Sequence, residues 1–156
     1  MPAKLQFFKP TWRWPYQIEA WLLKYSKGRL TLHIPCGLSK VGDVRADVDS
    51  YCKPDIICDL HYPPFRPHVF DLVITDPPWS NFSKQKWIHK LADLTKNEFL
   101  LNSPAMMYRL KHFTTEIILV TRTNKMFIGI WTRYARKYKI ISQYNEISLV
   151  NNTTQK

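Results

Sequence analysis

The sequence predicts an α/β fold with a mostly parallel sheet that ends in an antiparallel hairpin. Strand-like and helical segments alternate through the first two thirds of the chain. The clearest strand, residues 69–75 (VFDLVIT), is a nearly continuous apolar run, which is typical of a strand buried on both faces. Two apolar segments, residues 116–121 and 126–132, flank a short polar turn and predict the hairpin.

The first half of the chain predicts one helix and four strands. Residues 15–27 place apolar side chains at helical spacing, and Gly28 follows as a stop signal. Strands are expected over residues 30–34, 44–48, 55–58 and 69–75. The segments between the first three strands are shorter than the dozen or so residues that a helical crossover needs, so we expect reduced helices there. The aromatic side chains at the start are expected to pack against the sheet, with a stacking platform or a dimer contact as the alternative: Phe7, Phe8, Trp12, Trp14 and Tyr16.

The second half predicts a helix over residues 84–95, followed by a strand over residues 98–101. A short helix over residues 105–110, the hairpin and a last strand over residues 147–150 complete the expected elements. A chain of 156 residues fits a single domain.

The charge of the chain is uneven. Residues 1–78 carry ten basic and eight acidic side chains, whereas residues 79–156 carry thirteen and four. A strongly basic half suits a polyanionic partner, either nucleic acid or an acidic membrane surface. No stretch approaches the roughly 18 to 20 apolar residues of a membrane span, so we expect no membrane insertion and favour nucleic acid.

The three cysteines, Cys36, Cys52 and Cys58, form no C-x-x-C pair. Together with five scattered histidines they make no zinc ligand set, so no metal site is expected. The odd cysteine number and the lack of an apolar signal segment predict reduced, partly buried thiols and a cytoplasmic, intracellular location.

The motif Asp76-Pro77-Pro78-Trp79 directly follows the clearest strand. Ligands of open α/β sheets bind beyond the carboxyl ends of the strands, so the motif lies where a site is expected. Asp76 can accept one N–H of an aromatic amine and the Pro77 carbonyl the other, which aims the nitrogen lone pair. Trp79 offers a flat face on which an extruded base can stack. The alternative is an ordinary proline-rich turn.

Three further positions follow predicted strands. Gly37, in Pro35-Cys36-Gly37 after the first strand, lets the backbone approach a ligand closely. Asp47 ends the second strand, where a carboxylate can accept both hydroxyls of a ribose. Asp59 follows the third strand and could accept from an adenine amino group. Each aspartate alone could equally be a solvated surface group, but their recurrence at successive strand ends favours a nucleoside site.

Over residues 30–80 the chain resembles the class I S-adenosylmethionine-dependent methyltransferases, specifically the amino-methyltransferases with a D-P-P-[YW] motif. The stretches that carry the resemblance are HIPCG (33–37), ADVD (46–49), ICDL (57–60), YPPF (62–65) and FDLVITDPPW (70–79). The chain looks closest to small archaeal members, including ones carried by archaeal viruses. The resemblance implies a Rossmann-like sheet of seven strands with one antiparallel strand, and S-adenosyl-L-methionine in its crevice.

The resemblance also implies roles by position. The cofactor-binding residues would be Pro35, Cys36, Gly37, Asp47, Asp59 and Asp76. The target amine would be held by Asp76, Pro77, Pro78 and Trp79. Apart from the resemblance, substrate contacts are expected from Trp79 and from Lys84, Lys86 and Lys90, because these lysines lie on the segment right after the motif. The single methyltransferase domain, residues 1–156, would comprise an aromatic segment with a helix (1–29), a cofactor half with the DPPW motif (30–79) and a basic substrate-facing half (80–156). Two positions depart from the family pattern: His33 stands where an acid opens the cofactor loop, and Ser39 replaces a glycine.

The expected reaction is methylation of an exocyclic amino group of a nucleic-acid base, with adenine N6 in DNA favoured. An RNA base, at adenine N6 or guanine N2, stays open, as does a homodimer. Phosphate contacts could also come from further basic residues: Arg109, Lys111, Arg122, Lys125, Arg133, Arg136, Lys137 and Lys139. The rival interpretations are a catalytically decayed nucleic-acid-binding module, a methyltransferase for protein glutamine or a small molecule, and a basic adaptor in which DPPW is coincidental.

Overall fold

The structure is a computed structural model that describes residues 13–77, 86–102, 108–123 and 126–137. Its elements are α1 (Tyr16–Ser26), β1 (Thr31–His33), β2 (Val44–Asp47), a short 3-10 helix η1 (Ser50–Cys52), β3 (Ile56–Ile57), β4 (Phe70–Thr75), α2 (Lys86–Leu94), β5 (Thr95–Asn102), β6 (Phe113–Thr123) and β7 (Met126–Arg136). The expected strand at residues 147–150 lies outside the described residues, and so does most of the expected helix at 105–110, whose described residues are not helical.

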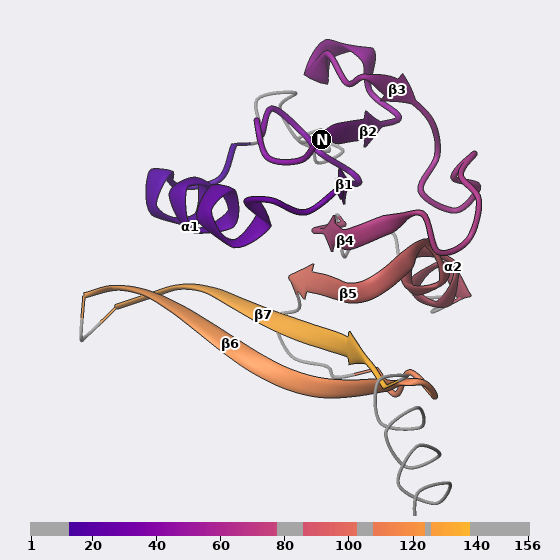
Figure 1. The fold of residues 1–156 in the computed structure, drawn as a ribbon. Coiled ribbons are helices and arrows are strands. Elements are labelled where there is room, and N and C mark those ends of the chain that lie inside the picture. The colour runs from indigo at the N-terminus through magenta and orange to yellow at the C-terminus, as the bar shows by residue number, and fades with distance from the viewer. Residues whose placement is uncertain (1–12, 78–85, 103–107, 124–125, 138–156) are drawn as a thin grey trace, which may run out of the picture.

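The strands of the described residues form one sheet in the order β3-β2-β1-β4-β5-β7-β6 (Figure 1). β1 to β5 run parallel to one another, whereas β7 is antiparallel to both of its neighbours, β5 and β6. The prediction of a mixed α/β fold with a mostly parallel sheet and an antiparallel end is therefore confirmed. The chain leaves β1 toward β2 and β3 on one side, and returns to β4 on the other side of β1.

Two apolar clusters cover the two faces of the sheet. On the α1 face, Ile18 and Leu22 of the helix pack with Leu72, Leu100 and Trp131. On the α2 face, the helix contributes Trp87, Ile88, Leu91, Ala92 and Leu94 to a larger cluster that also contains Phe99 and Leu101. Residues 99 to 101 of β5 thus alternate between the faces, as the period of two in a strand requires.

Helices are scarce in the first half, as expected. Within residues 34–69, all of which are described, η1 is the only helix. Loops, rather than helices, make the short connections between these strands. The loop after β3 places Leu60 and Phe65 against the α2-face cluster. Trp14, from the aromatic segment, packs on the other face, with its ring centroid 5.1 Å from that of Trp131. Phe7, Phe8 and Trp12 lie outside the described residues, and Tyr16 is exposed.

The start of β5 differs from the prediction, because the strand begins at Thr95, directly after α2, rather than at Glu98. The Thr95 hydroxyl donates to the Glu98 carbonyl at 2.8 Å and accepts the Glu98 N–H at 3.1 Å. These bonds hold a bulge, seen as a register shift against β4. Since Lys96 and Asn97 in the bulge are polar and exposed, the apolar pattern does not reveal it.

The hairpin is also longer than the prediction, since β6 begins at Phe113 and β7 ends at Arg136. The residue pairs added to the hairpin include Phe113 with Arg136, Thr114 with Ala135 and Thr115 with Tyr134. In the part of the chain that the structure describes, no helix has the length and apolar character needed to cross a membrane.

Candidate active site at the carboxyl edge of the sheet

The five parallel strands all end at one edge of the sheet, which we call the carboxyl edge. The last residues of β1, β2 and β4 there are His33, Asp47 and Thr75. The Ile34 N–H donates to the Ile74 carbonyl at 3.0 Å, so the segment after β1 runs beside the segment after β4. Because His33 also pairs with Ile74, the segment that begins at Ile34 and the first residue of the DPPW motif, Asp76, leave neighbouring strands at the same edge.

The segment after β1 is anchored to the end of β2 by two hydrogen bonds. The Cys36 N–H donates to the Ala46 carbonyl at 2.9 Å. The Gly37 N–H donates to Oδ2 of Asp47 at 2.8 Å. Gly37 has a φ of 52°, in the left-handed region that favours glycine, which explains this residue at the turn.

Asp47 holds a second segment as well as Gly37. Its Oδ1 accepts the Asp49 N–H at 3.0 Å, and the residue is only 7% exposed. An ionised carboxylate has about four acceptor positions, and these hydrogen bonds use two of them. Asp47 therefore has a structural role that the sequence did not reveal, and it lies at the end of β2, where the sequence predicted it.

Glu19, on α1, is a further residue that holds this loop and that the sequence analysis missed. Its two carboxylate oxygens accept the Ser39 hydroxyl at 3.0 Å, and Oε1 accepts the Lys40 N–H at 2.6 Å. The Ser39 hydroxyl oxygen in turn accepts the Val41 N–H at 3.1 Å. Ser39 thereby ties the loop to α1. No local spacing indicates a contact between positions 20 residues apart.

His33 is fully buried at the end of β1. Burial lowers the pKa of its imidazole to about 4, so the ring is neutral at pH 7, although the hydrogen bond between Nδ1 and the Val41 carbonyl opposes the shift. Within the described residues, Nε2 of His33 has no hydrogen-bond partner, and neither has the buried hydroxyl of Thr75 at the end of β4. The two side chains lie on opposite faces of the sheet, since His33 pairs with Ile74 of the α1-face cluster and Thr75 with Leu101 of the α2-face cluster.

Asp59 lies beyond the end of β3 and is exposed. Its Oδ1 accepts the His61 N–H at 2.8 Å and lies 2.7 Å from the His61 ring Nδ1. The bond from the His61 backbone, followed by the contact with the His61 ring, lowers the pKa of Asp59. Asp59 is thus an accessible carboxylate at the outer end of the carboxyl edge.

All three cysteines are free thiols, with Cys36 and Cys52 buried and Cys58 half-buried. Burial, followed by the nearby charge of Asp47, raises the pKa of Cys36 to about 12 and that of Cys52 to about 11. Neutral buried thiols are poor nucleophiles, so Cys36 contributes packing and shape to the loop after β1.

The structure describes only the first half of the DPPW motif. Asp76 is half-buried and Pro77 is buried, whereas Pro78 and Trp79 lie outside the described residues, as does Lys84. Lys86 is exposed at the first residue of α2, near the carboxyl edge.

Lys90 lies one helical turn further from that edge than Lys86. Its Nζ donates to the His61 carbonyl at 2.9 Å and lies 4.5 Å from the centre of the Tyr62 ring. It also lines a hollow of about 420 Å³ between the loop after β3 and the end of α2. The structure therefore brings Pro35, Cys36, Gly37, Asp47 and Asp76 together at the carboxyl edge, whereas Lys90 holds a neighbouring loop.

Comparison with known proteins identifies no family for this chain. No protein-family model matches the chain, and no curated protein matches it.

Proposed function

We propose that this chain is an S-adenosylmethionine-dependent methyltransferase that acts on the exocyclic amino group of a nucleic-acid base, with adenine N6 in DNA favoured. The observation that carries the proposal is the position of Asp76 and Pro77. They follow β4 at the carboxyl edge, beside the segment that follows β1. The strand order reverses between β1 and β4, and open α/β sheets bind their ligands at such a point.

Asp76 and Pro77 supply the acceptors that an aromatic amine needs. The lone pair of such an amine is delocalised into the ring, so the nitrogen is a weak nucleophile. A carboxylate oxygen of Asp76 and the Pro77 carbonyl can each accept one N–H, which turns the lone pair out of the ring plane. The rest of the reaction depends on holding the amine in line with the methyl donor, which is a proximity effect.

The residues of the carboxyl edge fit S-adenosylmethionine, which supplies an electrophilic methyl group when bound. Pro35, Cys36 and Gly37 would line its methionine part, Asp47 would accept the ribose hydroxyls and Asp59 would accept the adenine amino group. The two hydrogen bonds that fix the Asp47 carboxylate at the carboxyl edge support this fit. The sheet, with β7 alone running against its neighbours, agrees with the arrangement that the methyltransferase resemblance implies.

The basic charge of the chain favours a nucleic-acid substrate over a protein amide or a small molecule. The formal net charge is +11, and it is concentrated after residue 78. Lys86, at the start of α2, is exposed and follows the motif closely enough to contact a phosphate near the bound base. The same charge would serve RNA, which the labelling experiment below distinguishes from DNA.

A catalytically decayed nucleic-acid-binding module is the second candidate, and His33 favours it. A neutral, buried imidazole stands where the family has a charged acid. Such a module would bind nucleic acid and show no affinity for S-adenosylmethionine.

The two candidates are separated by calorimetric titration with S-adenosylmethionine and by a transfer assay. The protein is incubated with isotope-labelled S-adenosylmethionine and separate pools of duplex DNA, single-stranded DNA and structured RNA. Each pool is digested to nucleosides, and the labelled nucleoside is identified by mass spectrometry. The proposal predicts labelled N6-methyldeoxyadenosine. Label in the RNA pool alone would move the substrate to RNA, and absence of both binding and label would favour the decayed module.

A further inference from the structure

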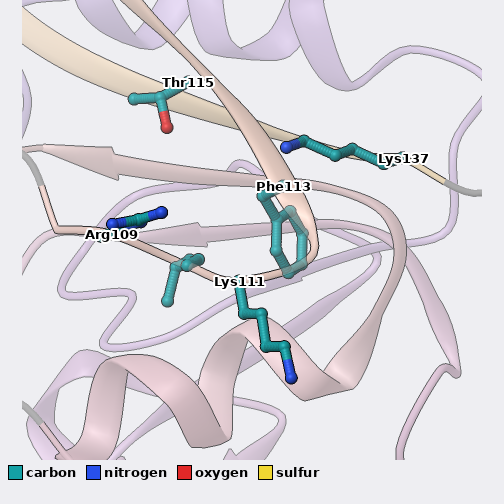
Figure 2. A pocket seen from close by; sticks show the side chains of 6 residues that line it. Arg109, Lys111, Phe113, Thr115 and Lys137 are labelled. Atoms are coloured by element: carbon teal, nitrogen blue, oxygen red, sulfur yellow. The ribbon is translucent and has the colours of Figure 1, made fainter.

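A cavity of about 300 Å³ lies at the far end of the sheet from the DPPW motif. It is lined by Arg109, Leu110, Lys111, Phe113, Thr115 and Lys137 (Figure 2). β6 starts at Phe113 and β7 ends at Arg136, and these residues pair with each other near the beginning of β5. The cavity therefore lies toward the amino end of β5, whereas Asp76 lies at the carboxyl edge.

Local hydrogen bonds bring the three cations of this cavity together. The Phe113 N–H donates to the Leu110 carbonyl at 3.2 Å, which closes a turn before β6. The Lys137 N–H donates to the His112 carbonyl at 3.1 Å, which ties the end of β7 to the same turn. Arg109 and Lys111, on one side of the turn, thus share a cavity with Lys137, although more than 20 residues separate them in the sequence.

The floor of the cavity is an aromatic ring in a fixed position. Phe113 is 7% exposed, and its ring packs edge-on against Tyr134. The guanidinium of Arg136 lies 4.6 Å from the centre of the Phe113 ring, and its Nη2 donates to the Ala92 carbonyl at 2.8 Å. Figure 2 shows Phe113 between Arg109 and Lys137, with the Lys137 ammonium group directed toward the space beside Thr115.

The cavity presents hydrogen-bond donors and positive charge. Arg109, Lys111 and Lys137 are exposed, and among the described residues none of them makes an ion pair. No acidic side chain is among the lining residues. A guanidinium, two ammonium groups and a hydroxyl around a small concavity suit an anion with several acceptor oxygens, as a phosphodiester has.

We propose that this cavity binds a backbone phosphate of the nucleic acid at a distance from the base that enters the candidate active site. The inference rests on the proposed function for the identity of the polyanion, but not for the methyl transfer. β6 is three strands away from β4, and Thr115 is level with Phe99, three residues before the end of β5. With strands roughly 4.8 Å apart and a rise of roughly 3.3 Å per residue, the cavity lies roughly 20 Å from Asp76. In a duplex this span corresponds to roughly six base pairs.

The test compares two variants that each lose three positive charges. The cavity variant is Arg109→Gln/Lys111→Gln/Lys137→Gln. The control variant is Lys24→Gln/Lys27→Gln/Lys40→Gln, which removes exposed lysines from α1, the residue after it and the loop after β1. Fluorescence anisotropy measures binding to hairpin-closed duplexes with about three or about ten base pairs on each side of a central adenine, over a series of salt concentrations. The urea midpoint of each variant establishes that it is folded.

The cavity variant should bind the long duplex roughly tenfold or more weakly at low salt, and its salt dependence should be smaller by about two to three ions. Its affinity for the short duplex should stay that of the wild type, and the control variant should keep the long-duplex affinity. An unchanged salt dependence in the cavity variant, or an equal loss in both variants, would overturn the inference. Binding to phosphatidylserine vesicles is measured alongside. A cavity variant that loses vesicle binding but keeps duplex binding would also overturn the inference, because the partner would then be a lipid surface. The result is independent of methyl transfer, so an enzyme that transfers no label could still pass this test.

Discussion

The N–H of Gly37 donates to Oδ2 of Asp47 at 2.8 Å, which fastens the loop after β1 to the last residue of β2. The other oxygen of the same carboxylate accepts the Asp49 N–H at 3.0 Å, so one buried side chain sets the course of two loops. In the proposed enzyme these loops line the cofactor. We therefore expect cofactor affinity and fold stability of the proposed enzyme to be coupled through Asp47.

Replacement of Asp47 by alanine should reveal that coupling. The substitution leaves the N–H groups of Gly37 and Asp49 without their acceptor, so we expect the free energy of unfolding to fall by about 1–3 kcal/mol. S-adenosylmethionine affinity, measured by calorimetry, should fall as well. Asp59→Ala is the matched control, because Asp59 is exposed: it should weaken cofactor binding and move the urea midpoint much less than Asp47→Ala does. An Asp47→Ala midpoint equal to that of the wild type would refute the anchoring role.

His33 should make the fold sensitive to mild acid. Its folded pKa of about 4 lies below the usual 6.5 because the ring is buried, so the folded state resists taking up a proton. The stability that depends on the neutral ring is present above pH 6.5 and is lost as the pH falls from 6.5 toward 4. His33→Asn keeps a donor for the Val41 carbonyl but does not titrate. Urea unfolding between pH 7.5 and 4 should show a smaller loss in this variant than in the wild type, and parallel curves would contradict the assignment.

Glu98 should make the stability of the fold depend on pH at lower pH values than His33 does. Burial alone would raise the pKa of its carboxyl, but hydrogen bonds from Arg133, Tyr25 and Arg29 outweigh burial and lower it to about 2. The Arg29 Nη1 lies 2.6 Å from Oε2, and the Glu98 side chain is 13% exposed. Because the pKa is lower in the folded state than in the unfolded state, where it is near 4.5, the ionised Glu98 stabilises the fold at pH values above 4.5. This contribution disappears as the pH falls toward 2.

Glu98→Gln supplies the comparison for that window, because glutamine fills the same space without titrating. Urea midpoints measured from pH 6 to pH 2 should fall more steeply in the wild type than in the variant. If both proteins lost stability equally below pH 4.5, the network around Glu98 would contribute nothing to the acid sensitivity.

The sequence predicted well those elements whose apolar residues recur in a regular pattern along the chain. The apolar run of β4, the helical spacing of α1 and α2, and the two apolar arms of the hairpin all lie where the pattern put them. The start of β5 escaped prediction because a side-chain bond, from Thr95 to the Glu98 backbone, replaces apolar alternation there.

Contacts between distant segments escaped prediction for another reason. Glu19 is 20 residues from Ser39, and Lys137 is more than 20 residues from Arg109, so only the folded chain brings each pair together. The sequence named Arg109, Lys111 and Lys137 as basic residues among others, but it contained no signal that they share a cavity. It placed the aspartates of the carboxyl edge correctly, because parallel strands end at one edge of a sheet.

Asp76→Ala removes the acceptor on which the proposed chemistry depends. Because Asp76 lies at the sheet edge and is half-buried, we expect the variant to fold and to bind nucleic acid much as the wild type does. Methyl transfer should nevertheless fall by roughly a hundredfold or more, as expected when an orienting group of an active site is lost. Asp93→Ala, at an exposed position near the end of α2, is the matched control and should keep full activity.

The most direct measurement is therefore the amount of labelled methyl group that the wild type and Asp76→Ala transfer to duplex DNA from S-adenosylmethionine. We predict labelled N6-methyldeoxyadenosine from the wild type, and none above background from Asp76→Ala. Equal label from both proteins would contradict the role of Asp76, and no label from the wild type in any DNA or RNA pool, with no cofactor binding by calorimetry, would contradict the methyltransferase itself.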